Sequence, residues 1–65
     1  MDEAREHVDQ YIDKFQASDH TLIKINDEKY PNMFLKKRLQ ARISEREISK
    51  LIVYVFMDTL YMEKI

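Results

Sequence analysis

The sequence predicts a mainly α-helical fold of three helices, with one short strand or extended segment between the first two, assembled as a dimer. Apolar residues recur at helical spacing in residues 3–17 and again in residues 31–43. Residues 44–64 are so apolar that a single helix there would carry two apolar faces. The chain has 65 residues and no cysteine, so disulfides and thiolate metal sites are excluded. A domain this small usually needs another form of support, most simply a second chain.

Residues 3–17 are predicted to form an acidic amphipathic helix. Asp2 and Glu3 favour the positive end of its dipole, and Ser18 and Asp19 are poor helix formers that would end it. The apolar side chains that line one face of this helix are Ala4, Val8, Tyr11, Ile12 and Phe15.

Residues 20–26 have the alternation of a short β-strand, since Ile23 and Ile25 alternate with Leu22 and Lys24. A strand must pair with another segment, and the rest of the chain offers no second convincing strand. The same strand of a second copy is therefore the expected partner. An extended linker laid across the helices is the alternative.

Residues 31–43 are predicted to form a second helix, with Pro31 in its first turn. Leu35, Leu39 and Ile43 lie four residues apart and mark its buried side. The opposite surface is basic and could meet phosphates or an acidic protein, unless it is simply solvated. Its basic residues are Lys36, Lys37, Arg38 and Arg42.

Residues 44–64 are predicted to form a long capped helix. Ser44 and Glu47 have the spacing of a capping box, in which each side chain bonds the backbone N–H of the other. At about 100° per residue, the polar residues fall in a sector about 80° wide, and the rest of the circumference is apolar. Either neighbouring helices enclose this helix, or a partner covers its second apolar face. We expect that face to be a partner or dimer interface formed by Val53, Phe56, Met57 and Leu60.

Charge is divided unevenly along the chain. Residues 1–19 contain six acidic and two basic side chains, a net charge of −4, whereas the remainder contains six acidic and nine basic ones, a net charge of +3. The two parts would attract each other within the molecule or would face different partners.

The order of strand, short helix, sharp turn and capped longer helix in residues 20–64 resembles the ribbon-helix-helix family of small dimeric DNA-binding repressors. The resemblance implies a two-chain ribbon in the major groove, with Lys24 and Asn26 reading bases and Ile23 and Ile25 packed inward. It also implies that the start of the last helix, at Ser44, touches phosphate. With the basic residues of the middle helix, the DNA-binding set would be Lys24, Asn26, Lys36, Lys37, Arg38, Arg42, Ser44 and Arg46.

The composition argues against catalysis. Glycine is absent, so a glycine-rich phosphate loop is excluded and turns would be made by Asn, Asp, Ser or Pro. His7 and His20 are separate surface histidines, so no metal site, cofactor, catalytic residue or small-molecule substrate is expected. The longest apolar run, residues 51–57, is too short to span a membrane, and the cytoplasm is the expected compartment.

Two functions are left open by the sequence. The first is a small non-enzymatic regulatory protein, an inhibitor or adaptor that binds a protein partner or a second copy through the apolar faces of residues 44–64. The alternative is a dimeric DNA-binding transcriptional repressor of the ribbon-helix-helix type, for which nucleic acid is the partner.

Overall fold

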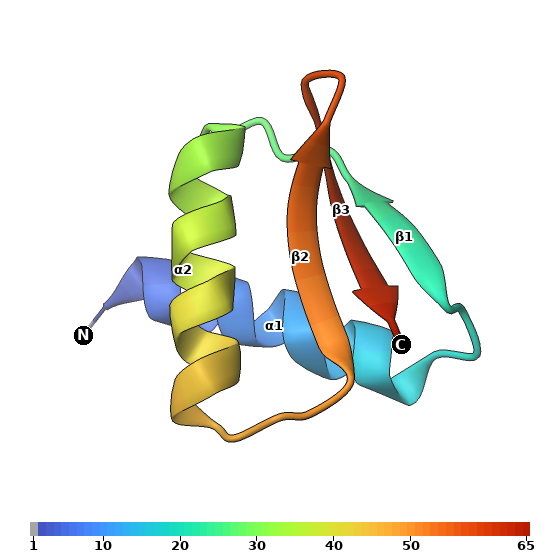
Figure 1. Cartoon of the computed structure of the whole chain (residues 1–65). Coiled ribbons are helices and arrows are strands. Elements are labelled where there is room, and N and C mark those ends of the chain that lie inside the picture. The colour runs from blue at the N-terminus through green and yellow to red at the C-terminus, as the bar shows by residue number, and fades with distance from the viewer. Residues whose placement is uncertain (1) are drawn as a thin grey trace.

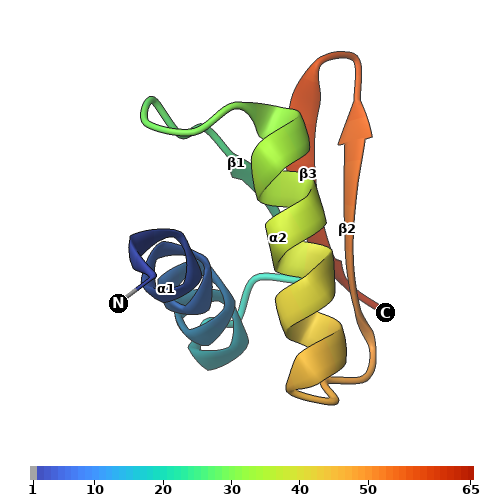
Figure 2. The ribbon, with the colours of Figure 1, turned by 90° about the vertical axis from the view of Figure 1, so that its left-hand side faces the viewer.

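The computed structural model describes residues 2–65 as an α+β fold. In chain order the elements are α1 (Glu3–Ala17), β1 (Leu22–Ile25), α2 (Asn32–Glu45), β2 (Leu51–Phe56) and β3 (Thr59–Lys64). The strands form one antiparallel sheet in the order β1-β3-β2. Both helices pack against the same face of this sheet (Figure 1, Figure 2). The prediction of a mainly α, three-helix fold is therefore wrong, because residues 51–64 form a β-hairpin.

The prediction for α1 is confirmed at both ends. The Asp2 carboxylate caps the helix and accepts from the backbone N–H groups of Ala4 and Arg5, at 3.1 and 3.2 Å. Ser18 ends it, since its hydroxyl donates to the Phe15 carbonyl at 2.8 Å. Local sequence alone is enough to define this helix.

The predicted strand between the helices is also present, as β1, but its partner is in the same chain. Leu22 is paired with Glu63 and Ile25 with Leu60, so β1 pairs with β3. The expectation that residues 20–26 lack a partner strand within the chain is therefore wrong.

Helix α2 begins at Asn32, one residue after the predicted start, with Pro31 as its N-cap, and extends through Glu45, beyond the predicted end at residue 43. Ser44 lies in its last turn rather than at the start of a new helix. The backbone carbonyl of Ser44, not its hydroxyl, accepts from the Glu47 N–H at 3.1 Å. The predicted capping box at residues 44–47 is therefore wrong. These residues form the C-terminal end of α2 and the start of the turn that follows it.

Within residues 2–65, four residues of this glycine-free chain adopt left-handed backbone conformations in the turns. Glu47 and Lys50, with φ of 56° and 62°, redirect the chain from α2 into β2. Met57 and Asp58, with φ of 49° and 61°, form the two-residue turn between β2 and β3. Asp58 fits the expectation for turn residues, whereas glutamate, lysine and methionine do not.

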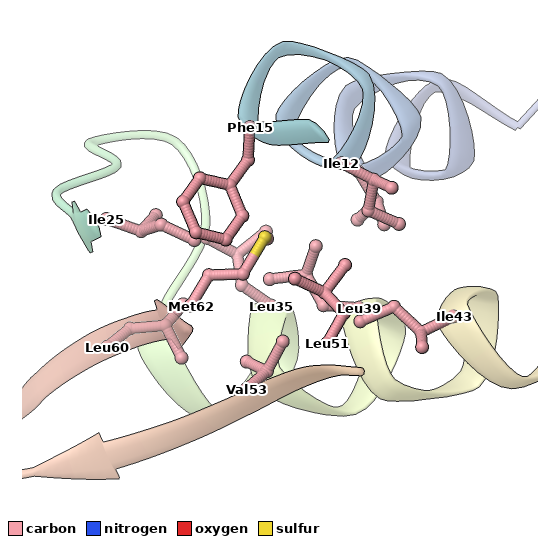
Figure 3. Close-up of a cluster of buried hydrophobic side chains, with 11 residues drawn as sticks. Ile12, Phe15, Ile25, Leu35, Leu39, Ile43, Leu51, Val53, Leu60 and Met62 are labelled. Carbon is pink, nitrogen blue, oxygen red and sulfur yellow. The ribbon is translucent and has the colours of Figure 1, made fainter. Parts of the chain in front are cut away.

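The hydrophobic core lies between the two helices and the covered face of the sheet. Figure 3 shows side chains from both helices and all three strands meeting there. Phe15 and Ile12 come from α1, and Leu35 and Leu39 come from α2. The strands contribute Ile25, Leu51, Val53, Leu60 and Met62.

Candidate functional site: the uncovered face of the sheet

The second face of the sheet has no helix against it. Successive side chains of a strand point to opposite faces, so the residues that alternate with the core positions point away from α1 and α2. Leu22, Ile52 and Phe56 on this face are 48%, 38% and 50% exposed. We call this surface the sheet face, and it consists of Leu22, Lys24, Ile52, Tyr54, Phe56, Thr59, Tyr61 and Glu63.

Two tyrosines occupy the middle of the sheet face. Tyr54 and Tyr61 are directly opposite each other on β2 and β3, and their rings stack with centroids 5.6 Å apart at 27°. The Tyr54 hydroxyl donates to Glu63 Oε1 at 3.0 Å. Burial, together with that hydrogen bond and the charge of Glu63, raises the pKa of Tyr54. The pair is therefore a preordered aromatic surface with its polar end already bonded.

Charge on the sheet face is sparse and balanced. Lys24, opposite Tyr61, is its one basic residue, and Glu63, opposite Leu22, is its one acidic residue. A face with five apolar or aromatic side chains and one charge of each sign suits contact with another apolar surface. It offers little to a phosphate backbone.

The structure separates the four predicted interface residues. Phe56 lies on the sheet face, and Met57, at the tip of the hairpin, is 85% exposed. Val53 and Leu60 lie in the core, 5% and 0% exposed, because they alternate with residues of the sheet face. Those two side chains are not available to a partner.

The arginines of α2 face the acidic residues of α1. Arg38 pairs with Asp2 at 3.2 Å, and Arg42 pairs with Asp9 at 2.8 Å. The hydrogen bond from Arg42 lowers the pKa of Asp9, against the opposing effect of burial. Arg46 approaches Asp9 at 3.5 Å and also Asp13 at 2.9 Å. These contacts confirm intramolecular pairing between the acidic and basic parts of the chain.

The other residues of the predicted DNA-binding set are spread over the molecule. Lys24 is on the sheet face, and Asn26 follows β1. Lys36, Lys37 and Ser44 belong to α2, which covers the other face of the sheet (Figure 2). The resemblance to the ribbon-helix-helix family required a second helix after α2. The structure has the hairpin of β2 and β3 there. The structure therefore does not place this set on one face of the molecule.

A polar cluster that sequence reasoning missed joins α1 to the loop after β1. The Asp27 carboxylate accepts from His7 and from the Tyr11 hydroxyl, the latter at 2.7 Å. Its other oxygen accepts from the backbone N–H groups of Lys29 and Tyr30, at 2.7 and 3.0 Å. His7 and Tyr11 are four residues apart on α1, but nothing in the sequence shows that Asp27 lies opposite them.

The electrostatics of this cluster favour a structural role. Burial alone would raise the pKa of Asp27, but the hydrogen bonds from His7, Tyr11 and the two backbone groups lower it well below its usual range. Burial and the Asp27 carboxylate raise the pKa of Tyr11 to about 12. The Asp27 side chain is 5% exposed and its oxygens are already bonded, so the cluster holds α1 in place.

Within residues 2–65, no three histidine, cysteine, aspartate or glutamate side chains are grouped so that they could hold a metal ion. The helices in that range are also too short or too polar to cross a membrane. Comparison with known protein families, curated proteins and solved structures gives no match. Function is therefore inferred from the geometry of the sheet face.

Proposed function

We propose that this protein is a small non-enzymatic binding module, an inhibitor or adaptor, whose sheet face docks on an apolar surface of another protein. The observation that supports the proposal is the position of the apolar side chains. Both helices cover one face of the sheet, and the opposite face presents Leu22, Ile52 and Phe56 to solvent beside a preordered tyrosine pair. A face that exposes several apolar side chains beside aromatic ones is typical of an interaction surface.

The energetics of the exposed side chains support the same proposal. Complete burial of one large apolar side chain contributes about 1.5–3 kcal/mol. Leu22, Ile52 and Phe56 are between a third and a half exposed, so covering them together would contribute roughly 2–4 kcal/mol. The stacked tyrosines add contact area. Because their rings are already ordered in the folded protein, binding would cost little further side-chain entropy.

A protein partner has more support than nucleic acid. Lys24 is the single basic residue of the sheet face. Arg38 and Arg42 of α2, and Arg46 directly after it, pair with Asp2, Asp9 and Asp13 on the helix side of the sheet. Aromatic side chains on a sheet can stack on bases, but Tyr54 and Tyr61 stack on each other. A cysteine-free chain is compatible with the proposal that this binding occurs in the cytoplasm.

Charge substitution on the sheet face tests the proposal. The double variant Ile52→Lys with Phe56→Lys should keep the circular dichroism spectrum of the wild type and lose capture of protein partners from nuclease-treated extract of the native cells. Met33→Lys is the matched control, since Met33 is 54% exposed on α2 and lies off the sheet face. Unchanged partner capture by the folded double variant would contradict the proposal. So would capture that nuclease treatment abolishes in the wild type.

A further inference from the structure

The backbone of β2 has hydrogen-bonding groups that face away from the sheet. Phe56 is paired with Thr59 across the two-residue turn, and the Ile65 N–H donates to the Lys50 carbonyl at 3.0 Å. The even-numbered residues of this strand therefore direct their backbone groups toward β3, and Leu51, Val53 and Val55 direct theirs outward. The side chain of Gln40 confirms this alternation, because its amide reaches the Val53 carbonyl from outside the sheet at 3.1 Å.

This edge lacks the features that usually keep a strand from pairing. Edge strands are commonly short or carry a charge, a proline or a bulge. β1, the other edge, has four residues and includes Lys24. β2 has six residues, Leu-Ile-Val-Tyr-Val-Phe, none charged, and is paired without a bulge along its full length. The Gln40 amide takes the place that the N–H group of an added strand would have.

An apolar hollow runs beside the same edge. It has a volume of about 260 Å³ and lies between α2 and β2. Its lining residues are Gln40, Ile43, Ser44, Leu51, Ile52 and Val53. A strand added to β2 would direct every second side chain toward this hollow and the others toward the sheet face.

The position of α2 disfavours a second copy of this chain as the added strand. α2 packs against β2 on the covered face of the sheet. Two chains paired through β2 would place their copies of this helix under strands about 4.8 Å apart, whereas packed helices need about 8–10 Å between axes. The edge therefore fits an extended segment that brings no helix of its own beneath it.

Basic side chains lie near both ends of the hollow. Lys36 and Lys37 precede Gln40 by four and three residues, so they project from the same side of α2. Lys50 is exposed and directly precedes β2. Within residues 2–65, none of these three lysines lies within 4.0 Å of a carboxylate oxygen, in contrast to Arg38 and Arg42 of α2. An acidic segment would therefore be complementary to this edge.

We propose that β2 receives an extended segment of the partner protein as a fourth strand, apolar at alternate positions and acidic at its flanks. The added backbone bonds Leu51, Val53 and Val55, and the Gln40 amide leaves the Val53 carbonyl. The inference rests on the proposed function, since it requires a protein partner, and it specifies how that partner is held.

The probe is a phage-displayed library of random peptides about ten residues long. Selection on the wild-type protein should enrich peptides with alternating apolar residues and flanking Asp or Glu. In nuclear magnetic resonance spectra of the complex, the amide protons of Leu51, Val53 and Val55 should shift and exchange more slowly with solvent. Methylating the peptide nitrogens that face β2 should weaken binding about fivefold to tenfold for each bond lost, and methylating the alternate nitrogens should have little effect.

Charge and edge variants complete the experiment. Reversing Lys36 and Lys37 to glutamate should weaken binding of the enriched peptides about tenfold, and the control Lys14→Glu on α1 should leave it unchanged. Val55→Pro removes one outward N–H group and leaves the β3 pairing of β2 in place, so it should weaken binding, whereas Val55→Thr should not. The methylated peptides give the same information on the wild-type protein if Val55→Pro does not fold.

Three outcomes would overturn the strand addition. They are enrichment of basic or helical peptides, spectral changes confined to side chains of the sheet face, and no enrichment. Each is separable from failure of the proposed function, which is measured by partner capture with the Ile52→Lys and Phe56→Lys double variant. If the double variant loses partner capture and any of the three outcomes is also observed, the sheet face binds protein but β2 does not receive an added strand.

Discussion

Tyr54 and Tyr61 face each other across β2 and β3, and Tyr54 is bonded to Glu63 beside them. The two rings are seven residues apart in sequence, which places them on one side of a helix and equally on one face of this hairpin. A shared side is therefore common to the predicted and the observed structure, but only the hairpin brings the two rings into contact. The hydrogen bond between Tyr54 and the Glu63 carboxylate is formed only in the sheet, so it provides a test of the observed structure.

Glu63→Gln should lower the pKa of Tyr54 toward its ordinary value. The carboxylate of Glu63 favours the protonated phenol through its charge and its hydrogen bond, and burial alone would keep part of the upward shift. Titration of the tyrosine ring signals by nuclear magnetic resonance measures the change. Glu28→Gln, at an exposed position outside the sheet, is the control and should leave Tyr54 unaffected.

Asp27→Asn should lower the free energy of unfolding by about 2 kcal/mol, because a buried charged acceptor with four donors is replaced by a neutral group that includes a donor. It should also lower the pKa of Tyr11 from about 12. Urea unfolding and tyrosine titration measure the two effects. Asp19→Asn, at an exposed position, is the control, and equal stability of the two variants would contradict the role assigned to Asp27.

The same carboxylate predicts an acid dependence of stability. The pKa of Asp27 in the folded protein lies below its unfolded value of about 4. Its contribution is therefore present above about pH 4 and is lost as the pH falls toward the folded-state pKa. Urea unfolding between about pH 2 and pH 7 should give a shallower decrease at low pH for Asp27→Asn than for the wild type. Parallel curves for the two proteins would rule this out.

The hairpin turn should be open to stabilisation. Met57 and Asp58 both adopt positive φ, which costs a residue other than glycine about 1 kcal/mol or more. The double substitution Met57→Asn with Asp58→Gly provides the residues preferred in such a turn and should raise the free energy of unfolding by about 1–2 kcal/mol. The Asp58 carbonyl that accepts from Asn32 at 2.7 Å is backbone and is retained. Met33→Asn, at an exposed methionine of α2, should give no such gain.

Sequence reasoning identified the elements whose signals are local. Residues 3–17 have one apolar face and a capping aspartate, and β1 has simple alternation, so both were predicted. The hairpin was missed because β2, Leu51–Phe56, is apolar on both faces. Projected at 100° per residue, such a segment looks like a helix that is apolar nearly all round, and the turn at Met57 and Asp58 lacks the usual Asn-Gly signal.

The candidate site was predicted only in part, for the same reason. Phe56 was correctly placed on an exposed apolar surface, but Val53 and Leu60 were grouped with it by helical geometry, whereas strand alternation turns them into the core. Leu22, Ile52 and the tyrosine pair join Phe56 only after β1 and β2 flank β3. The contact of Asp27 with α1 is set by tertiary packing, for which one sequence contains no signal.

Leu60→Ala and Phe56→Ala should separate the two faces of the hairpin. Leu60 is 0% exposed, so its truncation leaves a cavity in the core and should lower the free energy of unfolding by about 2–5 kcal/mol. Phe56 is half exposed on the sheet face, and its truncation should cost about 1 kcal/mol or less while weakening partner capture. Urea unfolding measures the first difference, and capture from extract measures the second.

On the predicted helix both residues would have lain on the same exposed surface, so equal and small losses of stability would contradict the sheet. A large loss for Leu60→Ala alone is what the alternation of β2 and β3 requires.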